Sequence, residues 1–231
     1  MKKFRHHYYN SLLKEADSKE GTVSDIQLSD TYLRELPDFI KDLHVRWSFD
    51  VSQNSLTSCK NFPKSMGRGG YISENKITSL EGLQRLPDLR FDMYDNKLTS
   101  VEPLSNLPSP RCKQIILDFN KLTSCKGLEN ITCAKLVLSH NEISSWEYIP
   151  DDISEIYVGN NKLTSWKGMP DGVDRLYMQN NWDVVDFNDY KEVRVSLWIS
   201  SSRWTSLESE KIYKYMESKG ITPPFVIEPI N

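Results

Sequence analysis

A short pattern of apolar and polar positions recurs along most of the chain. Around Asn141 the apolar residues lie five and three positions before the asparagine and two positions after it. The same frame recurs at six further asparagines, although a glycine replaces one apolar residue of the second and the last is interrupted on its C-terminal side: Asn54, Asn75, Asn96, Asn120, Asn161 and Asn181. Thr31 and Ser202 take this position, here called the anchor, in the first and last copies. Successive anchors lie 20 to 24 residues apart, and a repeat of this length predicts a solenoid of nine coils.

We expect each anchor to lie where the coil turns out of a short strand. The residues before it alternate between apolar and other types, which is typical of a strand with one buried face. Backbone groups at such a turn face inward, and an asparagine side chain can both donate and accept hydrogen bonds. Stacked asparagines would therefore satisfy these groups from coil to coil, and alanine at position 96 or 141 is expected to destabilise the fold.

The two ends of the array carry patterns that predict helical caps. Residues 1–24 place apolar side chains at helical spacing among charged ones. Residues 205–231 begin with Thr205 and Glu208 in the spacing of a capping box and end in an extended tail. Residues 25–204 between them form the predicted solenoid. Terminal coils need such caps because their apolar faces would otherwise meet water.

The repeat resembles that of leucine-rich repeat proteins, and residues 26–204 carry the resemblance. The motif Asn-Lys-Leu-Thr-Ser-x-x-Gly-x-Pro at residues 161–170 is similar to short repeats found in bacterial and bacteriophage proteins. The resemblance implies an α/β repeat architecture, a leucine-rich repeat solenoid with a parallel β-sheet on its concave side. Short turns and extended segments would form the convex side. The resemblance also implies that the concave face binds another protein.

Composition narrows the classes of function. With 29 basic against 32 acidic residues and a net charge of −3, the chain lacks the positive excess that favours binding to nucleic acid or to a membrane surface. No apolar run approaches the roughly 20 residues that span a bilayer. The N-terminus is basic and aromatic and has no signal-peptide core. We therefore expect a cytoplasmic protein that contacts neither nucleic acid nor a membrane.

The four cysteines indicate a reducing compartment. Cys59 and Cys125 lie five residues after their anchors, and Cys112 and Cys133 lie eight residues before theirs, where other coils place apolar residues. They are therefore predicted to be reduced core thiols, with a disulfide between Cys112 and Cys133 as the alternative. Closely spaced ligand pairs of the zinc-binding type are absent, so we expect no metal site and no cofactor.

The positions four, two and one residues before each anchor are expected to line the concave face. They are rich in carboxylates in the N-terminal half and form an apolar and aromatic stripe in the C-terminal half. Exposed apolar patches mark binding sites, and tyrosine and tryptophan are enriched among the residues that dominate binding energy. The predicted partner-binding residues are Asp92, Tyr94, Ile116, Asp118, Phe119, Val137, His140, Tyr157, Tyr177 and Trp198. The alternative interpretation is that the aromatics reflect strand propensity and the acids solubility.

Catalytic chemistry has little support in the sequence. Of the four histidines, His140 falls on the predicted concave face, and no nucleophile or carboxylate pair joins it in catalytic or metal-binding spacing. We therefore expect no catalytic residues and a non-enzymatic module that binds another protein.

Two hypotheses about biological setting follow from short resemblances. The phage-like repeats suggest a phage-encoded protein that acts on a host protein in the bacterial cytoplasm. The second hypothesis is a packaged or structural component of the virion. It derives from residues 13–16, Leu-Lys-Glu-Ala, which resemble the site cut by the head-maturation protease of T4-like phages. Cleavage would then fall between Glu15 and Ala16, whereas a plain capping helix is the alternative interpretation of this segment.

Overall fold

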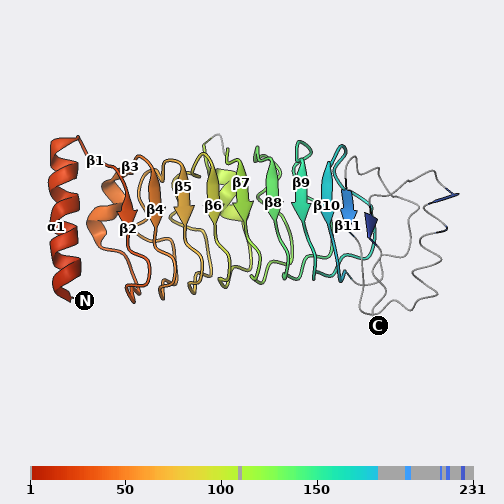
Figure 1. Ribbon diagram of the computed structural model, residues 1–231, viewed down its shortest axis with the longest axis horizontal. Helices are drawn as coiled ribbons and strands as arrows, with labels where there is room; N and C mark the ends of the chain where they lie inside the picture. Colours follow the sequence, from red (N-terminus) through yellow and green to blue (C-terminus); the bar gives the residue numbers. More distant parts are fainter. Residues whose placement is uncertain are drawn as a thin grey trace.

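Short strands that recur once per repeat lie side by side in one parallel sheet (Figure 1). In this computed structural model the sheet has ten strands, in the spatial order β12-β11-β10-β9-β8-β7-β6-β5-β4-β2. Their bounds are β2 Ile26–Gln27, β4 Ser48–Asp50, β5 Gly69–Tyr71, β6 Arg90–Asp92, β7 Gln114–Ile116, β8 Lys135–Val137, β9 Glu155–Tyr157, β10 Arg175–Tyr177, β11 Ser196–Trp198 and β12 Phe225–Val226. A separate parallel pair joins β1 (Thr22–Val23) to β3 (His44–Val45) at the N-terminal end. The structure describes residues 2–108, 111–181, 196–198, 214, 217–218 and 225–226.

The strand pairing preserves the frame that the apolar pattern predicts. The residue five positions before an anchor pairs with its counterpart in the next coil, as Phe91 does with Ile115. Gly70 keeps this register between Phe49 and Phe91. A Cβ at Gly70 would lie 2.9 Å from Met66 Sδ, so the methionine occupies the space that a larger strand residue would fill. The predicted parallel-sheet solenoid is therefore confirmed.

The anchor asparagines join neighbouring coils through their amide groups. Asn141 Nδ2 donates to the carbonyl of Leu117 in the preceding coil and to that of Leu138 in its own coil, both at 3.0 Å. Its Oδ1 accepts a hydrogen bond from the Leu122 N–H at 2.9 Å. The same three bonds recur at the other described anchors, Asn54, Asn75, Asn96, Asn120, Asn161 and Asn181. The predicted asparagine ladder is present, and it bonds coil to coil.

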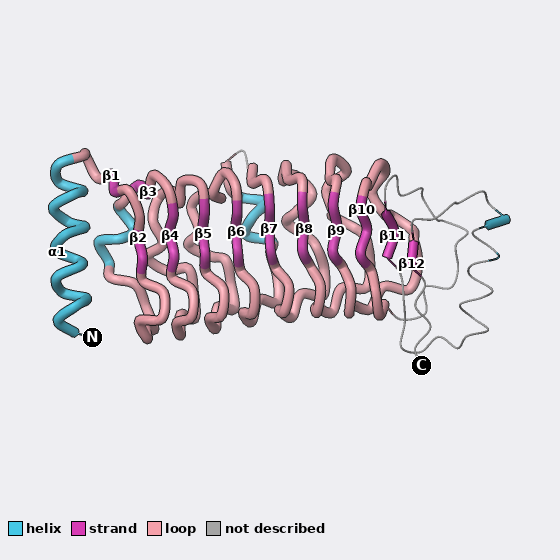
Figure 2. The backbone as a smooth tube through the Cα atoms, in the orientation of Figure 1, coloured by secondary structure: helices cyan, strands magenta, loops and turns pink. Residues whose placement is uncertain are grey.

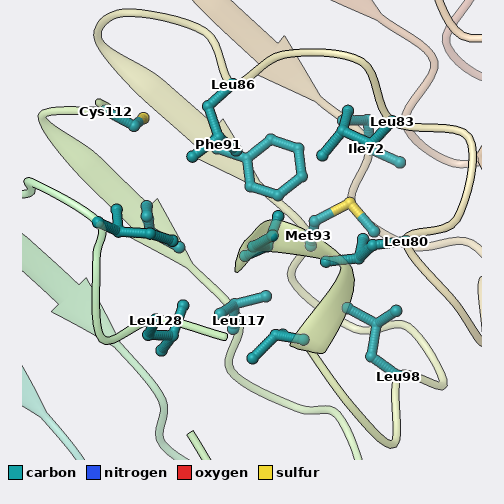
Figure 3. Packing of buried hydrophobic residues seen from close by; sticks show 14 of the residues in the cluster. Ile72, Leu80, Leu83, Leu86, Phe91, Met93, Leu98, Cys112, Leu117 and Leu128 are labelled. Atoms are coloured by element: carbon teal, nitrogen blue, oxygen red, sulfur yellow. The ribbon is translucent and has the colours of Figure 1, made fainter. Parts of the chain in front are cut away.

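The core is a narrow apolar strip between the sheet and the back of the coils. Figure 3 shows Phe91, Met93 and Leu117 from the strand side packed with Leu80 and Leu83 from the back of a coil, and all five are buried. All four cysteines are buried in this strip, and none of them is in a disulfide. Burial raises the pKa of their thiols, to about 12 for Cys59, so at neutral pH they remain protonated core residues.

The back of the coils absorbs differences in repeat length. The two longest intervals between anchors, Thr31 to Asn54 and Asn96 to Asn120, contain the 3₁₀ helices η1 (Asp38–Asp42) and η2 (Glu102–Asn106). The backs of the other described coils are turns and extended segments (Figure 2). Extra residues therefore change the back of a coil and leave the register of the sheet unchanged.

Helix α1 (Lys2–Ser18) covers the N-terminal end of the sheet (Figure 1). Its residues Leu12 and Ala16 are 4% and 6% exposed and belong to the core. The Tyr8 hydroxyl accepts a hydrogen bond from the Gln27 N–H at 2.7 Å. The helix thus covers apolar surface that the first coil would otherwise expose.

The proposed cleavage segment lies inside this helix. Glu15 Oε1 accepts hydrogen bonds from the Ser24 N–H at 3.0 Å and from the Ser24 hydroxyl at 2.8 Å. Ala16 is buried. A protease needs an extended substrate, so cutting between Glu15 and Ala16 requires this part of α1 to open.

The C-terminal end of the sheet gains a strand from the tail. β12 pairs in parallel with β11, with Leu197 opposite Phe225 and Trp198 opposite Val226. Apart from isolated positions, the predicted C-terminal helical cap within residues 205–231 lies outside the described residues.

Candidate interaction surface on the sheet

The outward side of the ten-stranded sheet, here called the sheet face, corresponds to the surface predicted to be concave. Strand side chains alternate between the two sides of a sheet. Leu136 and Leu138 are fully buried, Val137 and Ser139 are half-buried, and His140 is exposed. The positions four and two residues before an anchor therefore line the sheet face, as the sequence predicts.

The residue directly before each anchor has a left-handed backbone. Its φ lies between 47° and 57° at Asp30, Gln53, Glu74, Asp95, Phe119, His140, Asn160 and Asn180. Aspartate, asparagine and histidine adopt this conformation more readily than phenylalanine does. The conformation is held by the backbone, because the Phe119 N–H donates to the Ser139 carbonyl at 3.0 Å and the His140 N–H to the Gly159 carbonyl at 2.9 Å. The sequence analysis did not foresee this bend, although the frequent Asp and Asn residues at this position were a signal for it.

Three rings form a continuous row across neighbouring coils. Tyr94 and Phe119 meet edge to face, with centroids 5.3 Å apart and planes at 62°. Phe119 and His140 are stacked, with centroids 3.9 Å apart and planes at 18°. Burial lowers the pKa of His140, which favours the neutral ring in this stack. In the next coil the row of rings gives way to a polar side chain, since Asn160 Nδ2 lies at hydrogen-bonding distance, 3.2 Å, from His140 Nε2.

A second ring group lies in the next two coils. Tyr157 and Tyr177 are stacked with centroids 4.2 Å apart and planes at 7°. Lys135 Nζ lies 4.3 Å from the centre of the Tyr157 ring, and the Tyr157 hydroxyl donates to Glu155 Oε1 at 2.7 Å. Burial and this carboxylate raise the pKa of Tyr157 above its usual value. Both rings are thus held in place by residues of the chain itself.

Two predicted contact residues are more enclosed than expected, since Asp92 and Ile116 are each 7% exposed. Asp92 Oδ2 lies 2.8 Å from a guanidinium nitrogen of Arg90, and Asp92 Oδ1 accepts a hydrogen bond from the Tyr94 N–H at 3.1 Å. The carboxylate of Asp92 is therefore engaged within the chain. The position of a residue in the repeat cannot reveal this, because the enclosure depends on neighbouring side chains such as Arg90.

A hollow of about 480 Å³ opens in the middle of the sheet face. Its lining residues come from neighbouring coils: Ser73, Arg90, Asp92, Tyr94, Gln114, Ile116, Asp118, Lys135, Val137 and Tyr157. Arg90, Gln114 and Lys135 lie six residues before their anchors, one step further along the strand alternation. These three residues were not predicted, because the positions expected to line the face begin four residues before the anchor. We call this cavity the Asp118 hollow.

Asp118 has an unusual electrostatic position in this hollow. Its Oδ1 is buried and accepts no hydrogen bond from any described residue. Burial raises the pKa of Asp118 to about 6, and the neighbouring charge of Asp92 adds to the rise. Folding therefore leaves one buried carboxylate oxygen, Asp118 Oδ1, without a hydrogen-bond donor among the described residues, while a backbone hydrogen bond from Asp118 itself and the charge of Arg90 offset part of the rise in pKa.

The predicted site residues fall into three groups. Asp92, Tyr94, Ile116, Asp118, Val137 and Tyr157 line the Asp118 hollow. Phe119 and His140 extend the ring row that begins at Tyr94, and Tyr177 stacks on Tyr157. Trp198 lies in β11, whose backbone pairs with that of Tyr177, but its side chain lies outside the described residues. The structure thus brings nine of the ten predicted residues, all but Trp198, into one region of the sheet face.

Within the described residues, no three His, Cys, Asp or Glu side chains converge as metal ligands would. No helix in the described part of the chain is both long enough and apolar enough to cross a membrane.

Comparison with solved structures supports the fold. The structure of a Shigella effector leucine-rich repeat domain matches this chain with a TM-score of 0.51 and 20% sequence identity, covering 93% of this chain and 83% of that one. No protein-family model matches the chain, and no curated protein matches its sequence. The similarity shows a solenoid of the leucine-rich repeat type.

Proposed function

We propose that this chain is a non-enzymatic protein-interaction module that binds a partner protein through its sheet face. The observation that carries this proposal is the arrangement of rings on the sheet face in two groups: Tyr94–Phe119–His140, in which Phe119 and His140 are exposed, and the half-buried pair Tyr157–Tyr177. The apolar core lies on the other side of the sheet, so these rings contribute little to it. Ordered aromatic side chains lose little conformational freedom on binding and commonly dominate interface energies.

The backbone strengthens this proposal at Phe119. A left-handed conformation is unfavourable for a large side chain by about 1–2 kcal/mol, and Phe119 holds it with 42% of its surface exposed. Strained conformations of this kind cluster at functional sites. The same bend recurs in the other described coils, but at Phe119 it presents a large apolar ring on the sheet face, which supports a role for that ring in contacting a partner.

We propose further that the chain is phage-encoded and acts on a host protein in the bacterial cytoplasm. This proposal is supported by the sequence of the repeats, which resembles that of phage proteins, and by the similarity of the fold to a domain described as part of a Shigella effector. A role as a virion component is the weaker candidate, because the segment that suggested it is helical and Ala16 within it is buried.

Affinity capture from a bacterial lysate tests the proposed function. The double variant Tyr157→Ala with Tyr177→Ala removes one ring group while leaving the core untouched. We expect it to lose a protein that the unchanged chain retains, with at least about a tenfold drop in recovered partner, since two hot-spot rings are removed.

Tyr148→Ala provides the matched control for this capture. Tyr148 is 41% exposed, comparable to Phe119, but lies in the loop between β8 and β9. This variant should retain the partner fully. Equal capture by a correctly folded Tyr157/Tyr177 double variant would contradict binding through the sheet face.

A further inference from the structure

Two cations, Arg90 and Lys135, and two carboxylates, Asp92 and Asp118, line the Asp118 hollow, but each cation is paired with a carboxylate other than Asp118. Arg90 is paired with Asp92 at 2.8 Å and also donates to Gln114 Oε1 at 3.1 Å. Lys135 lies 3.5 Å from a carboxylate oxygen of Glu155, outside the hollow's lining. Both cations that line the hollow are thus engaged, whereas the buried Oδ1 of Asp118 accepts no hydrogen bond from the described residues.

The walls of the hollow suit a long side chain with an apolar stem. Ile116 and Val137 line it together with the rings of Tyr94 and Tyr157. A guanidinium is planar and weakly hydrated, stacks on aromatic rings and forms strong paired hydrogen bonds with carboxylates. A compact ammonium group would retain more of its hydration and could not stack in this way. The chemistry of the lining therefore favours arginine over lysine.

The surroundings of the hollow add negative charge. Glu74 and Asp95 lie at the left-handed positions of neighbouring coils on the same face. Asp95 Oδ1 lies 3.9 Å from Lys97 Nζ, so the added negative charge comes mainly from Glu74. Acidic surroundings attract a cation during the encounter and repel an acidic side chain. An acidic occupant would have to displace Asp92 from Arg90 or Glu155 from Lys135, whereas an arginine needs no existing pair to break.

We propose that the Asp118 hollow receives an arginine side chain from an extended segment of the partner protein, with its guanidinium paired to the Asp118 carboxylate. This inference rests on the proposed function of the sheet face. The hollow includes Tyr94 and Tyr157, which belong to the two ring groups. Residues on either side of the arginine would therefore contact one ring group each, so the expected motif is a single arginine flanked by aromatic or aliphatic residues.

A selection from a random peptide display library on the full chain tests this inference. The chain is immobilised as wild type, as Asp118→Asn and as Glu74→Gln. The last variant removes the same charge from the same face, but Glu74 does not line the hollow. We expect the wild type and Glu74→Gln to enrich one arginine with apolar neighbours, and Asp118→Asn to lose the arginine preference.

A second measurement isolates the pair itself. In a selected peptide the arginine is replaced by citrulline, which keeps the shape but not the charge. Citrulline on the peptide and Asp118→Asn on the protein should each weaken binding roughly tenfold or more, as expected for a charge-assisted hydrogen bond. The two changes together should weaken it little further, because the second acts on a pair that is already broken. Thermal melts of the Asp118→Asn and Glu74→Gln proteins establish that both variants are folded.

Three results would overturn the inference. They are selection of peptides without a basic position, equal arginine preference in the Asp118→Asn selection, and no peptide enrichment by the wild type. In each case the lysate capture with the Tyr157/Tyr177 variant decides separately whether the sheet face binds a protein. A failure of the arginine assignment is thus distinguishable from a failure of the proposed function.

Discussion

At the residue scale, Asp118 connects stability to binding. Its carboxyl group is harder to ionise in the folded chain than in the unfolded chain, because the pKa rises to about 6 from the usual 3.8. Between these two pH values the folded state binds more protons, so its stability falls as pH rises from about 4 and stays at the reduced level above about 6. The ionised Asp118 side chain thus lowers the stability of the free chain at neutral pH. Its presence is explained if a partner supplies the cation that the carboxylate lacks.

Replacing this carboxylate should therefore stabilise the free chain. Asp118→Asn is expected to raise the free energy of unfolding at neutral pH by on the order of 1 kcal/mol, a value reduced for the partial solvent exposure of the group. At about pH 4 the gain should vanish, because the wild-type group is then largely protonated. Urea denaturation at the two pH values measures both quantities. The exposed Glu74→Gln variant should show no such gain, and a gain for Asp118→Asn that is independent of pH would contradict the electrostatic explanation.

The anchor asparagines give the opposite outcome. Asn96 is 1% exposed, donates to the carbonyls of Ile72 and Met93, and accepts from the Ile77 N–H at 3.0 Å. Asn96→Ala leaves these buried backbone groups without partners and should reduce the free energy of unfolding by at least about 3 kcal/mol. Urea denaturation checks this value, with the exposed Asn106→Ala as the control that should change little. A loss below about 1 kcal/mol for Asn96→Ala would mean that water replaces the amide.

At the element scale, helix α1 illustrates how one face of a helix protects the end of a solenoid. Leu12 is 4% exposed and lies in the core, whereas its neighbour Leu13 is 38% exposed. Leu12→Ala should lower the free energy of unfolding by about 2–4 kcal/mol, as for other buried leucines. Leu13→Ala should change it by less than about 0.5 kcal/mol. Equal effects of the two substitutions in thermal or urea unfolding would show that the helix does not protect the first coil.

Strands and loops also show how far the sequence predicts this structure. The apolar frame around the anchors predicts the strands and their register, because burial of alternate residues depends on local spacing. Enclosure of Asp92 depends on Arg90 two residues earlier, and the isolation of Asp118 depends on side chains from several coils. The first property depends on a side-chain pair within one strand and the second on contacts between coils, and the repeat pattern specifies neither which side chains pair nor which stay apart.

Candidate site residues were predictable for the same reason and with the same limit. Positions four and two before the anchors identify Tyr94 and Tyr157, because strand alternation fixes their side of the sheet. Phe119, one residue before its anchor, lies in a left-handed bend, which alternation does not predict. The ring stacks and the hollow require actual distances between neighbouring coils. Left-handed backbone at Phe119 is set by hydrogen bonds to the next strand rather than by the preference of phenylalanine.

At the scale of the whole molecule, the buried thiols report on the opening of the solenoid. The chain has four buried cysteines, and burial raises the pKa of Cys125 and Cys133 to about 12. Disulfide exchange requires an accessible thiolate. Ellman's reagent at neutral pH should therefore react with almost no thiol in the native chain and with all four in concentrated urea. Ser58→Cys, which places a thiol at an exposed position next to buried Cys59, should add a single fast-reacting group. Rapid reaction of the unchanged native chain would contradict the burial.

The left-handed residues before the anchors have a consequence for how this protein could be redesigned. Eight described residues share this bend, and at the seven from Asp30 to Asn160 a main-chain hydrogen bond to the next coil, which does not depend on the side chain presented, secures it. Exchanging Phe119 or His140 for another residue should therefore alter the chemistry presented to a partner without changing the backbone bend, although it also removes the stack between these two rings. The side chains at these positions can in effect be exchanged on a constant backbone, and exchanging them offers a direct route to a binder with a new target.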